Sequence, residues 1–428
     1  MSDPLASSGH AVEPASRAAT AAARSAEGAP GTSRPRAVIV GAGIGGLTAA
    51  IALRRAGIEP VVYERVAELR PAGAGLTLAA NAGLALRALG VLDAIRARGA
   101  EIDVGEGRGP RGERLQRTPI GEIGRELGVS MIGLHRAALQ EVLLDALGRD
   151  RVRLGRECVG FTLHQDGVVV RFANGDEVEA DLLIGADGLH SVVRRQLHGE
   201  TPVRYAGYTS WRGVVEGGAS LIESGASVET WGPGRRFGMV PIGEGRAYWF
   251  ATANAPRGTS WRDREALLSR FGGWHPPIAA LIEATDPERL IQTDIVDRPP
   301  IDPWGRGCVT LLGDAAHPMT PNLGQGACQA IEDALVLANC LGRGSGVEAA
   351  LWTYERLRQA RTAEITRQSL RFGRLGQLEH PMACRIRNAA LRLTPAGVAL
   401  RQIGHLIEPG PAVREALSAV PGSTGVTR

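Results

Sequence analysis

The chain contains no lysine, and all 49 of its basic residues are arginines. Chemistry that needs a lysine amine is therefore excluded, including Schiff-base catalysis, pyridoxal attachment and the phosphate-binding lysine of P-loop proteins. The 45 acidic residues leave a formal charge of only +4. Because the arginines are scattered along the chain rather than clustered, the sequence does not favour a nucleic-acid partner.

Cysteine and histidine are also sparse. The cysteines are Cys158, Cys308, Cys328, Cys340 and Cys384. Their odd number and the lack of any CxxC pair argue against a disulfide framework and a zinc site, and indicate a reducing, cytoplasmic location. His317 has no second histidine or acid at metal-ligand spacing, and no Gly-x-Ser-x-Gly elbow surrounds Ser191. Neither a metal site nor acyl-transfer chemistry is therefore predicted.

Long apolar runs are missing as well. No stretch of about 20 apolar residues occurs, so no membrane-spanning helix is predicted. Residues 1–35 are rich in alanine, serine, glycine and proline, carry acids, and lack the apolar core of a secretory signal. They are predicted to form a disordered leader. The whole chain is 44% hydrophobic and 22% charged, which is typical of a globular protein with a sizeable core.

A glycine-rich turn follows the first apolar strand. The β-type run 37–40 leads into the sequence GAGIGG, then into a helical pattern that ends near Gly57, and then into a second strand at 60–63. This order of strand, glycine turn, helix, strand and acid is the one that a Rossmann-like dinucleotide fold requires, and the acid favours an unphosphorylated ribose. A pyrophosphate at the helix N-terminus would meet free amides. The predicted contacts are Gly41, Gly43, Ile44, Gly45, Gly46, Glu64 and Arg65.

Two further apolar strands run into loops that contain glycine and aspartate. The strand 181–184 continues into GADGLHSVVR, and the strand 309–312 continues into GDAAHPMTPNLGQG. Gly324 and Gly326 in the second loop let the backbone lie against a flat ring system. The helix that begins there directs its positive end toward a ligand on which negative charge develops.

Taken in order, these three motifs resemble the hallmarks of the group A flavoprotein monooxygenases, the para-hydroxybenzoate hydroxylase type, over roughly residues 36–370. The segment Tyr205–Tyr208, Trp211 and the PNLGQG loop are similar to the branch of FAD-dependent urate hydroxylase and zeaxanthin epoxidase. The resemblance implies bound FAD, transient NADH or NADPH, and dioxygen. It further implies oxygen transfer to the substrate from a flavin hydroperoxide.

The resemblance also implies roles for single residues. Asp314 is similar to the aspartate that hydrogen-bonds the ribityl chain or a nearby phosphate of FAD, and Asp187 to an acid implicated in FAD and NAD(P)H binding. Arg136 matches an arginine that contacts the cofactor, and Gly75 lies where the chain passes the flavin. An ordinary surface arginine and a turn-capping aspartate stay open as alternatives for Arg136 and Asp187. The last loop contributes Pro321 as a catalytic-site candidate and the cofactor contacts Gly324, Gln325, Gly326 and Ala327.

Aromatic residues concentrate in one quarter of the chain, with 12 of the 18 between residues 201 and 305. Together with strand-like stretches at 227–231 and 247–251, they predict a sheet that forms a wall for a flat apolar substrate, although aromatics also favour strands for packing alone. Arg212 corresponds to an arginine that related hydroxylases use near the reacting oxygen, and is the catalytic candidate. The usual partner tyrosine is missing, because Val240 precedes Pro241.

The sequence therefore predicts an α/β protein with a Rossmann-like FAD-binding domain, a mixed β-sheet substrate lobe and C-terminal helices. The FAD-binding domain is expected at 36–200 and 306–370, with smaller inserted strands near 75–130. The substrate lobe is expected at 201–305 and the helices at 371–428. The predicted function is FAD-dependent monooxygenation, by hydroxylation or epoxidation, of an aromatic or heteroaromatic substrate such as a lipophilic, quinolone-like secondary metabolite.

Several alternatives bear on this prediction. A flavin-dependent halogenase would need a relay lysine and is set aside. A reductase of isoprenoid-type substrates and a non-catalytic flavin-binding interaction protein stay open. A helix is expected over 348–377, followed by amphipathic segments over 386–406 that break at Pro395. Those segments either cap the substrate lobe or make a peripheral membrane contact, and no pattern reveals the oligomeric state.

Overall fold

The strands that precede the three glycine loops lie in one parallel sheet. The computed structural model describes residues 35–69, 74–261 and 263–419, so the predicted leader lies outside the described residues except for Pro35. The sheet has the order β18-β12-β1-β2-β8, and all of its pairings are parallel. Because carboxyl ends of parallel strands share one edge, the loops after β1, β12 and β18 lie together. The strands are β1 (Arg36–Val40), β2 (Glu59–Tyr63), β8 (Val152–Arg153), β12 (Leu182–Gly185) and β18 (Val309–Leu311).

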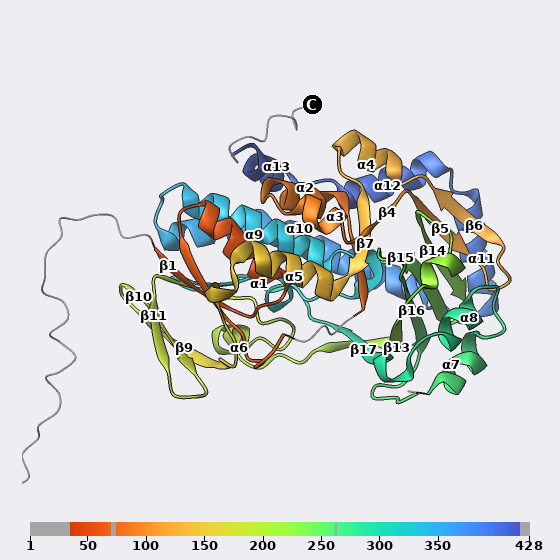
Figure 1. Ribbon diagram of the computed structural model, residues 1–428, viewed down its shortest axis with the longest axis horizontal. Helices are drawn as coiled ribbons and strands as arrows, with labels where there is room; N and C mark the ends of the chain where they lie inside the picture. Colours follow the sequence, from red (N-terminus) through yellow and green to blue (C-terminus); the bar gives the residue numbers. More distant parts are fainter. Residues whose placement is uncertain (1–34, 70–73, 262, 420–428) are drawn as a thin grey trace, which may run out of the picture. The chain divides into compact units, whose positions relative to one another are not determined.

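Helices cover this sheet and bury its apolar residues. The first predicted helix is α1 (Ile44–Arg55), and it packs against α9 (Gly326–Gly342), which in turn runs beside α10 (Val347–Gly376) (Figure 1). The crossing of α1 and α9 is tight, because a Cβ on Gly45 would lie 3.2 Å from the Cβ of Ala330. The remaining helices of this part are α2 (Ala80–Ala88), α3 (Leu92–Arg96), α4 (Gly121–Leu127), α5 (Arg136–Leu147) and α6 (Val192–His198).

Two small sheets flank the parallel one. The first has the order β3-β7-β4, and it places Gly75 opposite His135 at the start of α5. The second is an antiparallel meander with the order β11-β10-β9. Their strands are β3 (Gly75–Leu78), β4 (Ala100–Ile102), β7 (Met131–His135), β9 (Cys158–His164), β10 (Gly167–Phe172) and β11 (Glu177–Ala180).

The aromatic-rich segment forms a larger, mixed sheet of seven strands with the order β17-β13-β16-β15-β14-β5-β6. The sequence grouped residues 75–130 with the FAD-binding domain, but the structure adds two strands of that segment to this sheet. The reason is a parallel pairing between β14 and β5 that begins at Ala226 opposite Val104. The strands are β5 (Val104–Arg108), β6 (Arg114–Thr118), β13 (Arg204–Val215), β14 (Ala226–Gly232), β15 (Arg235–Pro241), β16 (Ala247–Asn254) and β17 (Ile291–Asp297).

The two faces of the seven-stranded sheet differ in character. One face carries Trp211, Phe237 and Trp249, which are fully buried in a cluster with α7 (Arg264–Phe271) and α8 (Ile278–Glu283). Alternate residues point to the other face. There Arg212 stands opposite Phe250, and Val214 stands opposite Tyr248. We call this second face, with Tyr208, Arg212, Arg236, Tyr248 and Phe250, the polar face of the sheet.

The C-terminal part is helical, as predicted. The helix expected over 348–377 is α10, so the expected domain boundary at 370 falls inside a continuous helix. Beyond it lie α11 (Pro381–Leu393), α12 (Ala396–Ile407) and α13 (Pro411–Ser418), and the predicted break at Pro395 is confirmed. Among the helices of the described residues, none has the length and apolar character needed to cross a membrane.

Candidate functional site

The first glycine loop is built around two close backbone contacts. Gly41 has a positive φ of 106°, and a Cβ on it would lie 2.5 Å from the carbonyl oxygen of Ala186 in the second loop. A Cβ on Gly46 would lie 2.0 Å from the carbonyl oxygen of Gly41. In contrast, nothing lies within 4 Å of a Cβ on Gly43, which caps the N-terminus of α1. The loop is therefore closed beneath α1 and open in front of it, as a bound pyrophosphate requires.

Glu64 lies across this loop at the end of β2. Its carboxylate accepts hydrogen bonds from the amide of Ala42 at 2.8 Å and from the amide of Val66 at 3.1 Å. The amide of Gly41 donates to the carbonyl oxygen of Tyr63 at 2.8 Å. These bonds hold the acid beside the open N-terminus of α1, where it can accept from ribose hydroxyls. The side chain of the neighbouring Arg65 is exposed, and its cofactor contact stays a prediction.

Asp187 in the second loop performs the capping role that the sequence left open. Its Oδ2 accepts hydrogen bonds from the amides of Val192 at 2.7 Å and Val193 at 3.4 Å, at the start of α6. Its Oδ1 is buried and has no hydrogen-bond partner among the residues that the structure describes. Burial raises the pKa of this carboxyl, against the lowering effect of its hydrogen bonds. The backbone of Asp187 lies against the first loop, since a Cβ on Gly41 would be 3.1 Å from its Cα, and the cofactor contact of Asp187 stays a prediction.

The last loop brings Asp314 and Arg136 to the same site. The Oδ1 of Asp314 lies 3.8 Å from a Cβ placed on Gly326, the first residue of α9. Asp314 keeps a solvent-exposed side chain, yet the surrounding protein removes enough water to raise its pKa, an effect opposed by His317 and Arg136. Arg136 is exposed at the start of α5, and its amide donates to the carbonyl oxygen of Ala74 at 3.1 Å.

The other predicted residues of this loop differ in their exposure and in whether their side chains or only their backbone can reach a cofactor. Gln325 is only 1% exposed, and its Oε1 accepts from Asn81 at 3.1 Å and from Gln329 at 3.0 Å. Its side chain points into the protein, so only its backbone can face a cofactor. Pro321 is exposed and begins a short 3-10 turn that ends before Gly324, whose φ of 64° requires glycine. Ala327 follows in the first turn of α9 and is half-buried.

The polar face of the sheet supplies a tyrosine that the sequence analysis missed. Tyr248 packs against β3, because a Cβ on Gly75 would lie 2.4 Å from the Cγ of Tyr248. Burial raises the pKa of the Tyr248 phenol, and the nearby charge of Arg212 opposes that rise. Tyr248 therefore lies beside Arg212, although the expected position before Pro241 holds a valine. This neighbourhood depends on the strand pairing: Phe250 lies opposite Arg212, and Tyr248 lies two residues before Phe250 on the same face of the sheet, opposite Val214.

A buried arginine that the sequence analysis also missed joins this face to the last loop. Arg236 is 2% exposed. Its guanidinium donates to Glu229 at 3.0 Å, to Asn322 at 2.6 Å and to Gln377 at 3.1 Å. The hydroxyl of Tyr208 donates to the same Asn322 oxygen at 3.0 Å. The available signal was a pair of arginines, Arg235 and Arg236, that leads into the apolar residues of β15.

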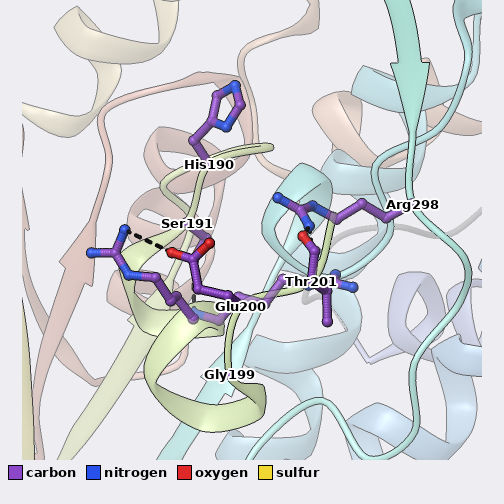
Figure 2. A pocket seen from close by; sticks show the side chains of 8 residues that line it. His190, Ser191, Gly199, Glu200, Thr201 and Arg298 are labelled. Atoms are coloured by element: carbon purple, nitrogen blue, oxygen red, sulfur yellow. Dashed lines mark hydrogen bonds and ion pairs between the residues drawn. The ribbon is translucent and has the colours of Figure 1, made fainter. Parts of the chain in front are cut away.

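A separate basic pocket lies beside the second loop, as Figure 2 shows. The buried Arg194 donates to the carbonyl oxygens of Ala315 and Ala316 at 3.0 and 2.9 Å, and its Nε is buried without a partner. Burial, with a smaller contribution from Arg298, lowers the pKa of Arg194 to about 10. The positive charge in this pocket suits an anionic group. The pocket is lined by His190, Ser191, Arg194, Arg195, Gly199, Glu200, Thr201 and Arg298.

These features define a class of protein. The three loops at one sheet edge, the open N-terminus of α1 with its acid, and the start of α9 above Asp314 form a site for a flavin dinucleotide. An aromatic and arginine-bearing sheet face lies beside that site. A flavoprotein that brings an organic substrate next to its flavin fits this geometry.

Comparison with known proteins assigns the family. The model of the FAD binding domain family matches residues 35–369, and the chain belongs to this family. It is 49% identical over 358 residues to aurachin C monooxygenase/isomerase of Stigmatella aurantiaca, covering 83% of this chain and 93% of that protein. It is 38% identical over 336 residues to FAD-dependent urate hydroxylase of Klebsiella pneumoniae, covering 77% and 87%. The crystal structure of Klebsiella pneumoniae HpxO with FAD and uric acid matches with a TM-score of 0.84 and 34% identity, covering 88% and 97%.

The chain is therefore a FAD-dependent monooxygenase of the single-component hydroxylase type. FAD is its cofactor, and NAD(P)H is the co-substrate typical of the family. The predicted family, fold class and cofactor are confirmed. The reductase and non-catalytic alternatives are not favoured, since these relatives are named as a monooxygenase and a hydroxylase. The individual site residues stay predictions that rest on the geometry above.

We expect Gly43→Ala to weaken FAD binding without weakening the fold. The added methyl group meets no protein atom within 4 Å, so the free energy of unfolding of the apoprotein should stay within about 0.5 kcal/mol of wild type. The same methyl occupies the space left for the pyrophosphate, and the Kd for FAD should rise at least about tenfold. Flavin titration and denaturant unfolding of the apoprotein measure both quantities.

The matched control is Gly397→Ala, on α12, where an added methyl also meets no atom within 4 Å. It should leave FAD affinity unchanged, and because alanine is the better helix former it should raise the free energy of unfolding by at most about 1 kcal/mol. Wild-type FAD affinity in Gly43→Ala would remove Gly43 from the cofactor site.

Proposed function

We propose that this monooxygenase oxygenates a flat, lipophilic heteroaromatic ring of the quinolone type, with aurachin C as the first compound to test. The observation that carries the proposal is the polar face of the sheet, where Tyr248 and Phe250 lie beside Arg212 next to the flavin loops. Aromatic side chains suit a flat apolar ring, and an arginine suits an oxygen on it. The relative with 49% identity is named for aurachin C.

Bound FAD, once reduced by NAD(P)H, supplies the activated oxygen. The protein residues position the substrate and exclude water. Arg212 is half-buried beside Tyr248, so its guanidinium can stabilise negative charge that develops on a ring oxygen of the substrate. Tyr248 remains protonated at neutral pH because burial raises its pKa, and it can donate a hydrogen bond to the same oxygen. The N-terminus of α9 offers its dipole to the flavin side of the site.

The test is turnover with a defined substrate. FAD-loaded protein should consume NAD(P)H faster when aurachin C or a simple alkyl quinolone is added, and mass spectrometry should show a product with one oxygen atom from labelled dioxygen. A second product of the same mass would indicate an isomerisation step. Product without label, or substrate-independent NAD(P)H consumption alone, would contradict the proposal.

Arg212→Ala is the matching variant. It should lower kcat with this substrate by about one hundredfold, the range reported for loss of one oxyanion-stabilising donor, while FAD stays bound. Arg289→Ala is the control and should turn over normally, because Arg289 is exposed in the 3-10 turn just before β17 and pairs with Glu216. Turnover of Arg212→Ala equal to wild type would remove Arg212 from the reaction.

We also propose that the basic pocket holds a phosphate group of NAD(P)H. Support comes from the buried, unpartnered Nε of Arg194 and from Arg195 and Arg298, against which the lining sets only one acid, Glu200. The pocket adjoins the last loop through the bonds of Arg194 to Ala315 and Ala316. A coenzyme whose phosphates bind here would lie beside the last loop, which Arg194 contacts.

Arg298→Ala should raise the KM for NAD(P)H about tenfold, as expected for one lost charge-assisted contact. The Kd for FAD should change much less than this KM, because the side chain of Arg298 contacts the second loop only through the carbonyl oxygen of Leu189 at 3.3 Å. Steady-state kinetics at saturating substrate measure the first and flavin titration the second. Arg149→Ala, an exposed arginine paired with Asp145, serves as control, and an unchanged KM in Arg298→Ala refutes the assignment.

The peripheral membrane contact is proposed for α11. Met382, Ile386 and Leu393 are 53%, 64% and 81% exposed on one stripe of this helix, with the exposed Arg385 and Arg392 beside it. Exposed apolar side chains flanked by arginines are typical of a helix that lies in an anionic membrane interface. The opposite side of α11 is buried through Cys384 and Arg387. The helix can therefore cover the substrate lobe with one side and contact a membrane with the other.

Co-sedimentation with vesicles of anionic phospholipid tests the contact. The wild-type protein should bind, and replacement of Met382, Ile386 and Leu393 by serine should abolish binding without changing FAD content. Trp352→Ser is the control, because Trp352 is 59% exposed but lies on α10. No sedimentation of wild type at low salt would refute the proposal.

A further inference from the structure

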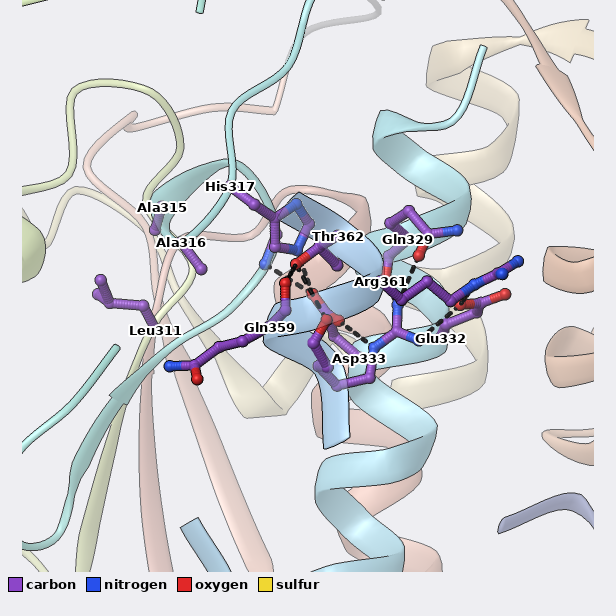
Figure 3. A network of polar contacts seen from close by, with 12 residues as sticks. Leu311, Ala315, Ala316, His317, Gln329, Glu332, Asp333, Gln359, Arg361 and Thr362 are labelled. Atoms are coloured by element: carbon purple, nitrogen blue, oxygen red, sulfur yellow. Dashed lines mark hydrogen bonds and ion pairs between the residues drawn. The ribbon is translucent and has the colours of Figure 1, made fainter. Parts of the chain in front are cut away.

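A fully buried arginine on α10 forms hydrogen bonds with α9 just behind the last flavin loop. Arg358 is 1% exposed. Its guanidinium donates to Asp333 at 2.7 Å, to Glu332 at 2.7 Å and to the side chain of Gln329 at 2.7 Å. Gln329 lies one turn before the adjacent Glu332 and Asp333 on α9, and the three side chains point toward α10, as Figure 3 shows.

This network reaches both ends of the last loop. At one end, Asp333 accepts hydrogen bonds from His317 at 2.6 Å and from the amide of Gly313 at 3.1 Å. At the other end, the side-chain amide of Gln329 donates to the side-chain oxygen of Gln325 at 3.0 Å. The segment from Gly313 to Gln325 is therefore held by α9 at its beginning and its end, and Arg358 holds the α9 side chains that do so.

The network also places negative charge behind a helix N-terminus. Glu332 and Asp333 are both 0% exposed, and Glu332 lies only about 9 Å along α9 from Gly326 at a rise of about 1.5 Å per residue. The N-terminus carries about half a positive charge. Two uncompensated carboxylates at this distance in a poorly solvated interior would outweigh it.

The titration behaviour of the network agrees with compensation by Arg358. Burial works against the charged form of Asp333, but His317 and Arg358 outweigh it and hold the pKa of this carboxyl below its usual value. Burial also works against the charged form of Arg358, and the two carboxylates outweigh it, so its pKa is raised. Arg361 contributes less, because its nearest approach to Glu332 is 3.7 Å and it is partly exposed.

We propose that Arg358 sets the reduction potential of the bound flavin by offsetting one of the two negative charges that Glu332 and Asp333 place on α9 behind its N-terminus. The inference rests on the proposed position of the flavin at the start of α9. Reduction adds negative charge to the flavin, so buried anions nearby disfavour it and their neutralisation favours it. Arg358 acts through Glu332 and Asp333 and is a positioning residue rather than a catalytic one.

Redox titration of the FAD-loaded protein tests this inference through two variants of opposite charge effect. Arg358→Met should shift the flavin midpoint potential to a more negative value, and slow flavin reduction by NAD(P)H on the order of tenfold. Glu332→Gln removes one buried anion and keeps hydrogen-bonding atoms for Asn81 and Arg358, so its potential should become more positive. The double variant should return toward the wild-type value.

Arg367→Met provides the control, since Arg367 lies on the same helix but is exposed and paired with Glu364. A purely structural role for Arg358 predicts lost FAD without opposite shifts, so shifts in the same direction, or none, overturn the inference. Where Arg358→Met does not fold, Glu332→Gln alone decides. If wild type binds no FAD, the proposed flavin site itself fails, whereas bound FAD with unchanged potentials overturns only the role of Arg358.

Discussion

The close approach of the first two loops is the contact on which the rest of the site depends. A side chain at Gly41 would collide with the backbone of Ala186 and Asp187, and one at Gly46 would collide with Gly41 itself. These contacts bring α1 down onto the sheet and leave the space in front of Gly43 open. They also fix the backbone of Asp187 next to the first loop, because a Cβ on Gly41 would lie 3.1 Å from the Asp187 Cα.

The last loop depends on α10 rather than on the sheet. On one side, Arg358 organises the α9 side chains that hold Gly313 and Gln325. On the other side, Ser369 bonds the Thr320 hydroxyl at 2.9 Å, and its carbonyl oxygen accepts from Asn322 at 2.9 Å. One continuous helix thus positions the loop from behind the flavin site and from the substrate side. Since buried polar groups are costly when unpaired, these bonds leave the loop few alternative positions.

In the seven-stranded sheet, residues that pack the core alternate along each strand with residues that face the proposed substrate site. Trp211 and Trp249 fill the core under α7 and α8, while their neighbours Arg212 and Tyr248 face the flavin loops. Arg236 extends this polar face to Asn322 in the last loop. A substrate bound on the polar face, as proposed, would contact groups that also bond the last loop through Asn322.

The sequence by itself determined the parts whose physics is local. The unit from β1 through α1 to β2, the acid Glu64, the strands before each loop and the break at Pro395 follow from hydrophobic period, glycine geometry and proline within short windows. The absence of lysine excluded whole classes of chemistry. The family resemblance then identified Asp187, Asp314 and Arg136 as candidates from three separate regions of the chain.

Only the tertiary structure decided which distant residues meet. The pairing of β14 with β5, the position of Tyr248 beside Arg212, and the burial of Arg236 and Arg358 depend on contacts between segments far apart in sequence. An arginine in a strand or helix has the same local pattern whether solvent or a carboxylate surrounds it. Its role is decided by the low dielectric of the folded interior and by the partners brought there, and neither exists until the chain is folded.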